Sequence, residues 1–354
     1  MDTQLITGFA YLLLGATCGG SFGLPSKYVR QGTPWEVLWG PFFFFVTIAM
    51  PLAAGPLLVN DFFAIFHAAG WAGLALPLAL GLLWGAGSMT LGMSFAFIGL
   101  SLAYSMNYGA QIITGAIAPM ALQHPDRILT AHGGVILLGI GVCLAGVAVA
   151  GRAGILKDRS LGKGPSNAAS TSKKSPKMLV GLSLAAVSGV LCGCYGVAAS
   201  YTGPLAKVAQ ETFHSNAWQV SVVTTIIILW GGAISSCLYC AFLLTKNKTW
   251  NNLASPGIGL TLFVALVMAI LHNGAIYLFN LGFPLLGPDL GVSVGYAAFM
   301  SFAIIVGNFH GFRTGEWKGA SRQSIAWIVA GILVLILGVC ILAQGNAMAP
   351  RAAS

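Results

Sequence analysis

Residues 152–177 read RAGILKDRSLGKGPSNAASTSKKSPK, and the organisation of the chain follows from this stretch. It is rich in Gly, Ser, Pro and Lys and has no hydrophobic period, so it predicts a flexible linker. The sequence on both sides of it is strongly apolar. We therefore divide the chain into a first part, residues 1–151, the linker, residues 152–177, and a second part, residues 178–354.

The composition around the linker excludes an ordinary soluble domain. Of the 354 residues, 57% are hydrophobic and only 7% are charged, whereas about 25% of the residues of a typical soluble domain are charged. The 47 glycines and the mean hydropathy of +0.84 are typical of transmembrane helices, in which small residues let backbones approach closely. The net charge of +9 does not indicate nucleic-acid binding, because little of the chain offers a solvated basic face.

The apolar stretches predict ten membrane-spanning helices, since roughly 20 apolar residues in a helix cross a bilayer core about 30 Å thick. They are expected at residues 6–24, 37–59, 71–96, 99–120, 132–151, 178–202, 217–244, 257–281, 289–311 and 323–344. The boundary at 97–99 carries no charge, so it is a very tight turn or a misplaced boundary. Five crossings before the linker invert the second half relative to the first, as in many secondary transporters. The predicted fold class is an all-α integral membrane protein with ten transmembrane helices in two inverted five-helix repeats.

The distribution of Lys and Arg predicts the orientation in the membrane. Fourteen of them lie in loops that follow odd-numbered predicted helices, and three, Arg127, Lys207 and Arg351, lie on the opposite side. Without the seven in the linker the ratio is still 7 to 3. Because basic loops stay inside the cell, we expect a cytoplasmic linker and both termini outside the cytoplasm.

The chain lacks the usual signatures of enzymes and of resident metals. Its seven cysteines fall in apolar runs, without His or carboxylate neighbours at metal-ligand spacing, so we expect neither a disulfide framework nor a metal site. It has no phosphate-binding Gly-rich loop, Gly-x-Ser-x-Gly elbow or His-Glu-x-x-His pair. The linker is too short to be an ATPase domain. The sequence thus predicts no enzyme and no cofactor, and it leaves an ion or solute gradient as the energy source.

Polar residues at membrane depth are costly unless they face a cavity or a partner, so they mark candidate sites. The helix predicted at 99–120 has such residues at i, i+3, i+4 and i+7, on one face. They are Tyr104, Asn107, Tyr108 and Gln111. Amides and phenols supply the donors and acceptors that would hold a sugar or another polyhydroxylated solute. The alternative is hydrogen bonding between helices.

A second polar set lies in the helix predicted at 257–281. It consists of His272, Asn273, Tyr277 and Asn280, of which the last three share one face. His272 is a candidate for substrate binding or proton handling, or it is a structural residue. The helix predicted at 71–96 adds Trp84 and Ser88 on one face. Trp84 either stacks on a sugar ring or packs within the bundle.

Two carboxylates are expected at membrane depth, Glu36 and Asp289, each at the start of a predicted helix. A proton-coupled carrier needs a group that titrates near neutral pH. Asp289 is our first candidate because prolines surround it, Glu36 is the second, and His272 is the third because its ordinary pKa is about 6.5. The alternative for both acids is a favourable interaction with the helix macrodipole. Lys27 is expected to pair with Glu36, as a gating or a structural contact.

Specific motifs give the chain a family resemblance. In the first half they are Pro25-x-Lys27 with Trp35-Glu36 and Trp39, Trp84-Gly85-x-Gly87 with Gly92 and Gly99-Leu100-Ser101, and Arg152-Ala153-Gly154-x-x-Lys157-x-Arg159. In the second half they are Gly231-Gly232-Ala233-Ile234, Met300-Ser301-Phe302 and Glu316-Trp317. Through these motifs the chain resembles the L-rhamnose/proton symporter family of the drug/metabolite transporter superfamily. The resemblance implies ten helices and uptake of L-rhamnose with a proton across the bacterial inner membrane. In that membrane the expected orientation places both termini in the periplasm.

Two regions depart from the family pattern. The helix at 99–120 is more polar than in the family, and residues 281–295 do not align without a gap. Because both regions are candidates to line the cavity, a different deoxyhexose or another monosaccharide is an alternative substrate. Three further function classes stay open from the sequence: a proton-coupled exporter, a carrier of another small polar metabolite, and a membrane scaffold. The expected partners are a small sugar, a proton and the lipid bilayer, with no nucleic acid; the sequence specifies no oligomeric state.

Overall fold

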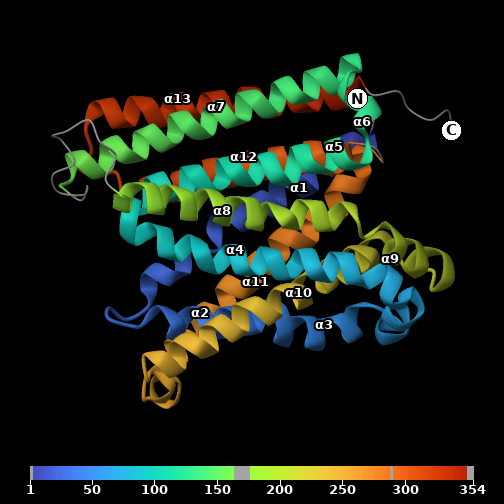
Figure 1. Cartoon of the computed structure of the whole chain (residues 1–354), viewed down its shortest axis with the longest axis horizontal. Coiled ribbons are helices and arrows are strands. Elements are labelled where there is room, and N and C mark those ends of the chain that lie inside the picture. The colour runs from blue at the N-terminus through green and yellow to red at the C-terminus, as the bar shows by residue number, and fades with distance from the viewer. Residues whose placement is uncertain (1–2, 163–175, 288–289, 349–354) are drawn as a thin grey trace.

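The protein is represented by a computed structural model that describes residues 3–162, 176–287 and 290–348. Within these ranges the description leaves out the side chains of 92–93, 95–96, 98–105 and 176–178. Every regular element of the described residues is a helix (Figure 1). This confirms the all-α prediction.

The first half holds the elements up to Ser160. They are α1 (Thr3–Ser21), η1 (Leu24–Tyr28), α2 (Trp35–Phe44), η2 (Phe45–Ala49), α3 (Met50–Leu58), α4 (Phe62–Ile112), η3 (Ile113–Ile117), α5 (Ala118–Gln123), α6 (Pro125–Ile128) and α7 (Ala131–Ser160). The second half begins at Pro176. Its elements are α8 (Pro176–Ser200), α9 (Gly203–Lys207), η4 (Val208–Thr212), α10 (Ala217–Lys246), η5 (Trp250–Ala254), α11 (Ile258–Gly282), η6 (Phe283–Leu286), α12 (Gly291–Arg313) and α13 (Arg322–Ala347).

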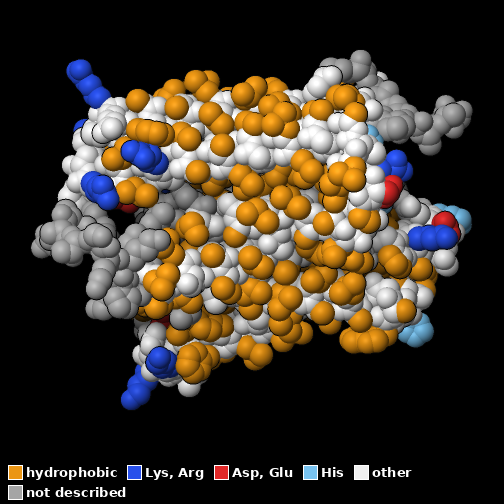
Figure 2. All heavy atoms as spheres, turned by 45° about the horizontal axis from the view of Figure 1, so that its top comes forward, with side chains coloured by type: hydrophobic (Ala, Val, Ile, Leu, Met, Phe, Trp, Pro, Cys, Tyr) orange, Lys and Arg blue, Asp and Glu red, His pale blue; other side chains and the backbone are white. Residues whose placement is uncertain are grey.

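The surface has the pattern of a multi-pass membrane protein. Within the described residues, nine helical segments are long and apolar enough to cross a bilayer. In Figure 2 hydrophobic side chains cover the middle of the molecule, whereas charged side chains gather at its two ends. The predicted helix at 99–120 falls on the end of α4, η3 and α5, which are not among the nine. The ten-helix count and the inverted repeat fit this arrangement and remain predictions.

Helix α4 doubles back on itself. In a straight helix Gly87 and Asn107 would be separated by about 30 Å, because each residue adds about 1.5 Å. Ser188 of α8 nevertheless contacts both: its Oγ donates to the Gly87 carbonyl at 2.7 Å and accepts from Asn107 Nδ2 at 2.8 Å. The chain therefore reverses between Gly87 and Asn107, a stretch that includes the turn predicted at 97–99. We call residues 62–91 the first arm of α4 and residues 106–112 its second arm; Figure 1 shows both along α8.

Two π-helical turns have the same cause in the sequence. Each of η2 and η3 ends two residues before a proline, Pro51 and Pro119 respectively. Proline has no backbone N–H and its ring crowds the carbonyl one turn earlier, so a wider turn is a low-cost way to continue the helix. The Val46 carbonyl in η2 accepts a hydrogen bond from the side chain of Asn273. The widened turn thus takes part in a contact with α11.

Helix α7 continues into the stretch predicted to be linker. The first nine linker residues, 152–160, are its last turns. Arg152 lies over the ring of Trp327 at 4.6 Å, and Lys157 lies over the ring of Trp317 at 4.9 Å. Lys157 and Arg159 also lie in the last turn, where a cation is favoured by the helix dipole. The basic residues that suggested a linker therefore anchor the end of a helix on α13 and the loop before it.

Glycines allow the two halves to pack closely at one edge of the molecule. Helices α7 and α13 lie side by side there (Figure 1). A Cβ added to Gly146 would lie 2.8 Å from the Leu335 side chain, and one added to Gly338 would lie 2.5 Å from Cys143 Sγ. Small residues at such positions are the usual means by which helices associate in lipid. Elsewhere the halves interlock, because α1 packs on α11 and α12 and α8 packs on both arms of α4.

Candidate functional site

A chain of hydrogen bonds that joins the two halves passes through the second arm of α4. Tyr296 of α12 donates its hydroxyl to Gln111 Oε1 at 3.3 Å, and Gln111 Nε2 donates to Asn107 Oδ1. Asn107 Nδ2 then donates to Ser188 Oγ, which donates to the Gly87 carbonyl. Asn107 and Ser188 are fully buried. Each amide oxygen and each amide nitrogen in this chain has a partner within the protein.

The other candidates on α4 are the two tyrosines of this face and Ser88, which the sequence places with Trp84 instead. Tyr108 is half-buried and packs against the central core. Tyr104 lies outside the described side chains. Ser88 of the first arm donates to the carbonyl of Trp84 at 3.1 Å, one turn earlier. The sequence left two alternatives for the Asn107 and Gln111 face, a substrate cavity or hydrogen bonding between helices. The described contacts of this face are hydrogen bonds between helices.

Helix α11 contains a different kind of polar cluster, which we call the α11 cluster. Its members are His272, Asn273, Tyr277 and Asn280. Each has one buried polar atom without a hydrogen-bond partner among the described residues. These atoms are His272 Nδ1, Asn273 Oδ1, Tyr277 Oη and Asn280 Oδ1. An unpartnered buried polar group costs about 1 to 3 kcal/mol, so four of them within nine residues of one helix need an explanation.

The remaining polar atoms of the two asparagines hold their side chains in place. Asn280 Nδ2 donates to Tyr195 Oη at 3.1 Å and to Thr225 Oγ1 at 2.6 Å. Asn273 Nδ2 donates to the Val46 carbonyl at 3.3 Å. The amide nitrogens therefore bind the protein, while the carbonyl oxygens have no hydrogen-bond partner among the described residues.

Aromatic rings from the first half surround His272. The centroid of its imidazole lies 5.3 Å from Phe22, 5.7 Å from Phe42 and 5.8 Å from Trp84. Trp84 also contacts Tyr195 at 6.0 Å, and Tyr195 is the acceptor for Asn280. Trp84 thus connects His272 to the other end of the α11 cluster. Three of the predicted site residues, Trp84, His272 and Asn280, belong to one neighbourhood.

The α11 cluster lies deep in the membrane and between the halves. The candidate span Ile258–Leu286 has its midpoint by residue count at His272. The rings of Phe22, Phe42 and Trp84 come from the first half, and the cluster itself from the second. In secondary transporters, substrate sites lie near the bilayer midplane where two repeats meet. By residue count the α11 cluster begins at this depth, and its unpartnered acceptors and hydroxyl would suit a solute with several hydroxyl groups.

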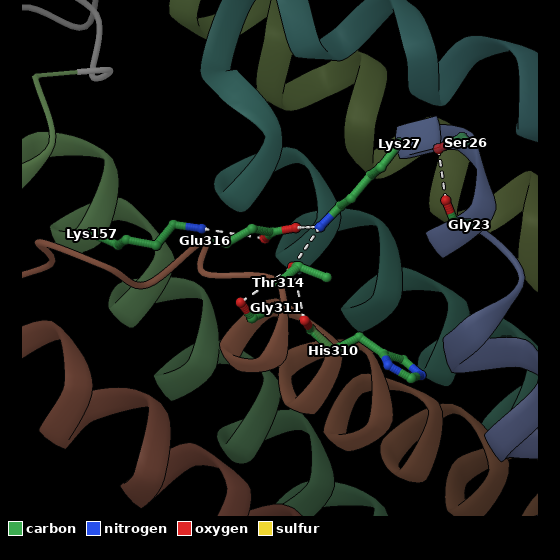
Figure 3. Close-up of polar contacts among 8 residues, drawn as sticks. All are labelled: Gly23, Ser26, Lys27, Lys157, His310, Gly311, Thr314 and Glu316. Carbon is green, nitrogen blue, oxygen red and sulfur yellow. Dashed lines mark hydrogen bonds and ion pairs between the residues drawn. The ribbon is translucent and has the colours of Figure 1, made fainter. Parts of the chain in front are cut away.

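The structure does not bring Lys27 and Glu36 together. Lys27 Nζ instead makes an ion pair with Glu316 and donates to Thr314 Oγ1 at 2.8 Å (Figure 3). Glu316 Oε2 also lies 4.0 Å from Lys157 Nζ, which approaches from the opposite side. These three charged residues connect η1 and α7 of the first half to the loop before α13.

Glu36 has two partners in the loop after α10. Its Oε1 accepts from Asn247 Nδ2 at 3.0 Å and from Thr249 Oγ1 at 2.8 Å, and the residue is 4% exposed. The loop contacts of Glu36 and the Lys27–Glu316 pair take the place of the predicted Lys27–Glu36 contact. Asp289, the first candidate for proton coupling, lies outside the described residues.

Several residues at this site could not be selected from the sequence. Tyr195, Thr225 and Tyr296 contact predicted site residues, but each lies in a mainly apolar stretch without a pattern that distinguishes it from other polar residues nearby. Phe42 is one of four consecutive phenylalanines, residues 42–45, and Phe22 is a single aromatic residue in a Gly-rich stretch, so neither is marked by a pattern. Only the three-dimensional arrangement selects them. Among the residues that the structure describes, no three His, Cys, Asp or Glu side chains are grouped so as to hold a metal ion.

Comparison with known proteins gives a family. The sequence matches the family described as L-rhamnose-proton symport protein (RhaT) over residues 1–349. It is 27% identical to the L-rhamnose-proton symporter of Yersinia pestis (strain Pestoides F), and the alignment covers 98% of this chain and 100% of that protein. The L-rhamnose-proton symporter of Cronobacter sakazakii (strain ATCC BAA-894) is also 27% identical, with 98% and 99% covered. These relatives are named as symporters, which are transporters and not enzymes.

A solved crystal structure supports the fold. It superimposes with a TM-score of 0.52 at 17% sequence identity, and the alignment covers 96% of this chain and 98% of that chain. At this identity the likeness concerns the fold alone.

Proposed function

The chain belongs to the L-rhamnose-proton symport protein family, and from that premise we propose that it carries L-rhamnose or a related monosaccharide into the cell together with a proton. The membrane would be the bacterial inner membrane. The linker would face the cytoplasm and both termini the periplasm, as the 14 to 3 distribution of Lys and Arg predicts.

The α11 cluster is the observation that carries the proposed substrate class. A monosaccharide presents hydroxyl groups that donate and accept, and one apolar face that stacks on an aromatic ring. The Asn273 and Asn280 carbonyl oxygens and the Tyr277 hydroxyl lack partners within the described protein, so sugar hydroxyls would satisfy them. Trp84 supplies the aromatic ring beside them. A lipophilic cation without hydroxyl groups would leave the amide oxygens and the Tyr277 hydroxyl without hydrogen-bond partners. This favours a neutral polar solute as the substrate.

We propose His272 as the first of the described groups to test for proton coupling. An imidazole can take up and release a proton, as the coupling group of a proton-driven carrier must. Its Nδ1 has no partner among the described residues, whereas the Glu36 carboxylate already accepts two hydrogen bonds from the loop after α10. Asp289 remains a candidate from the sequence alone.

The proposed function is tested by uptake of radiolabelled L-rhamnose into cells that lack their own carrier for it. We expect accumulation that a protonophore abolishes and that unlabelled L-rhamnose and related deoxyhexoses inhibit. Amphipathic cations should not compete, because they offer no hydroxyl groups to the α11 cluster. Cells that contain the protein in the membrane and still take up no more sugar than control cells would contradict the proposal.

A further inference from the structure

A cavity lies at the end of the molecule that carries the Lys27–Glu316 pair. Its volume is about 290 Å³, and its lining includes Ser26, Arg30, Thr33, Trp35 and Trp39. These residues belong to η1, the turn after it and the start of α2. We call this cavity the η1–α2 pocket. By the distribution of basic residues it opens toward the cytoplasm.

The lining of the η1–α2 pocket suits a small neutral sugar. Trp35 and Trp39 stack on each other with centroids 5.7 Å apart and planes within 16°, which provides a flat aromatic surface. The Ser26 and Thr33 hydroxyls donate to backbone carbonyls at 2.6 and 2.8 Å, so their oxygens remain free to accept. The guanidinium of Arg30 adds a fork of donors. The volume of the pocket lies near the lower limit of ligand pockets, about 300 Å³, which is enough for a small ligand.

A continuous series of ring contacts leads from this pocket to the α11 cluster. Trp39 contacts Phe42 at 5.1 Å, and Phe42 contacts His272 at 5.7 Å. Phe22 stacks on Phe42 at 5.8 Å with planes within 21°, and it also contacts His272 at 5.3 Å. One pair of aromatic rings, Phe22 and Phe42, therefore separates the lining of the pocket from His272.

We propose that the η1–α2 pocket is a second binding site for the neutral monosaccharide, on the cytoplasmic branch of the transport pathway. The sugar moves from the α11 cluster past Phe22 and Phe42 and stacks on the Trp35–Trp39 pair before release. Arg30 donates to its hydroxyl groups there. This proposal rests on the proposed transport function and extends it to a site that sugar binds from the cytoplasmic side of the membrane only.

The test measures downhill flux of radiolabelled L-rhamnose in right-side-out and inside-out vesicles, so that each face of the protein is saturated separately. The variants are Arg30→Lys, which keeps the charge but loses the planar fork, and Trp35→Leu, which removes the aromatic surface. We expect the half-saturation concentration at the cytoplasmic face to rise at least about fivefold, and that at the periplasmic face to change less than about twofold. Matched controls at the same end are Arg313→Lys and Trp250→Leu, which should change neither value.

The outcomes separate the two proposals. If wild-type vesicles show no sugar flux, the transport function itself is wrong. If wild-type flux is normal but the pocket variants change both faces equally, or neither face, the second site is wrong while the transport function stands. Inhibition at the cytoplasmic face by a sugar phosphate, stronger than by L-rhamnose and retained in Arg30→Lys, would also overturn it, because the pocket would then be an anion site.

Discussion

The polar faces of α4 and α11 each carry two amides and at least one tyrosine, at helical spacing, where the two halves of the protein meet. On α4, Asn107 and Gln111 bond to each other and to partners on α8 and α12. On α11, the carbonyl oxygens of Asn273 and Asn280 have none among the described residues. The two faces look alike in sequence, but they differ in whether their amide oxygens have hydrogen-bond partners within the protein.

This difference assigns the two faces to different tasks. A closed hydrogen-bond chain stabilises the contact between helices and leaves nothing for a ligand. In the α11 cluster the amide nitrogens bind the protein, which fixes the side chains, and the oxygens are left as unused hydrogen-bond acceptors. A binding site requires both properties. We therefore infer that the α4 face holds the halves together and that the α11 face holds the substrate.

The largest effect is expected at His272. Gln at this position still forms hydrogen bonds but cannot be protonated, so His272→Gln should abolish accumulation of sugar against its gradient. Downhill exchange of labelled for unlabelled sugar should persist. His132→Gln, which changes another buried histidine, on α7, is the matched control and should accumulate sugar normally. Accumulation by His272→Gln at the wild-type level would remove this residue from proton coupling.

An intermediate effect is expected at Asn107, and it concerns stability. Asn107→Leu keeps the approximate size but leaves Ser188 and Gln111 without their partner, at a cost of about 1 to 2 kcal/mol. We expect a lower unfolding temperature of the purified protein in detergent, with an unchanged half-saturation concentration for the sugar. Asn308→Leu is the control, because Asn308 donates only to a carbonyl of its own helix. A raised half-saturation concentration at normal stability would instead place Asn107 in the substrate site.

Much of the fold follows from the sequence because its physical cause is local. Stretches of about 20 apolar residues are read directly as helices, and the boundaries of α10, α11 and α13 lie within three residues of those expected. The extension of α7 was missed because Arg152 and Lys157 are indistinguishable from linker residues until their aromatic partners are known. The short α9 and η4 were missed for a different reason. A helix without a full apolar span leaves only a weak pattern in the sequence.

The candidate site was predictable only in part. Spacing along one helix identified the face of α11, because residues three and four apart lie together. The neighbours of that face come from other helices: Tyr195 and Thr225 lie 85 and 55 residues away from Asn280 in the chain. The sequence also cannot show whether an amide has a partner, and that property separates α4 from α11.

The most direct test compares two tyrosines that each lose only a hydroxyl group. The Tyr277 hydroxyl has no partner among the described residues, whereas the Tyr296 hydroxyl donates to Gln111. Tyr277→Phe should raise the half-saturation concentration for the sugar about five- to tenfold and leave the unfolding temperature unchanged. Tyr296→Phe should lower stability by about 1 kcal/mol and leave the half-saturation concentration unchanged. The opposite pattern, or the same pattern in both variants, would contradict the assignment of the α11 face to substrate and the α4 face to structure.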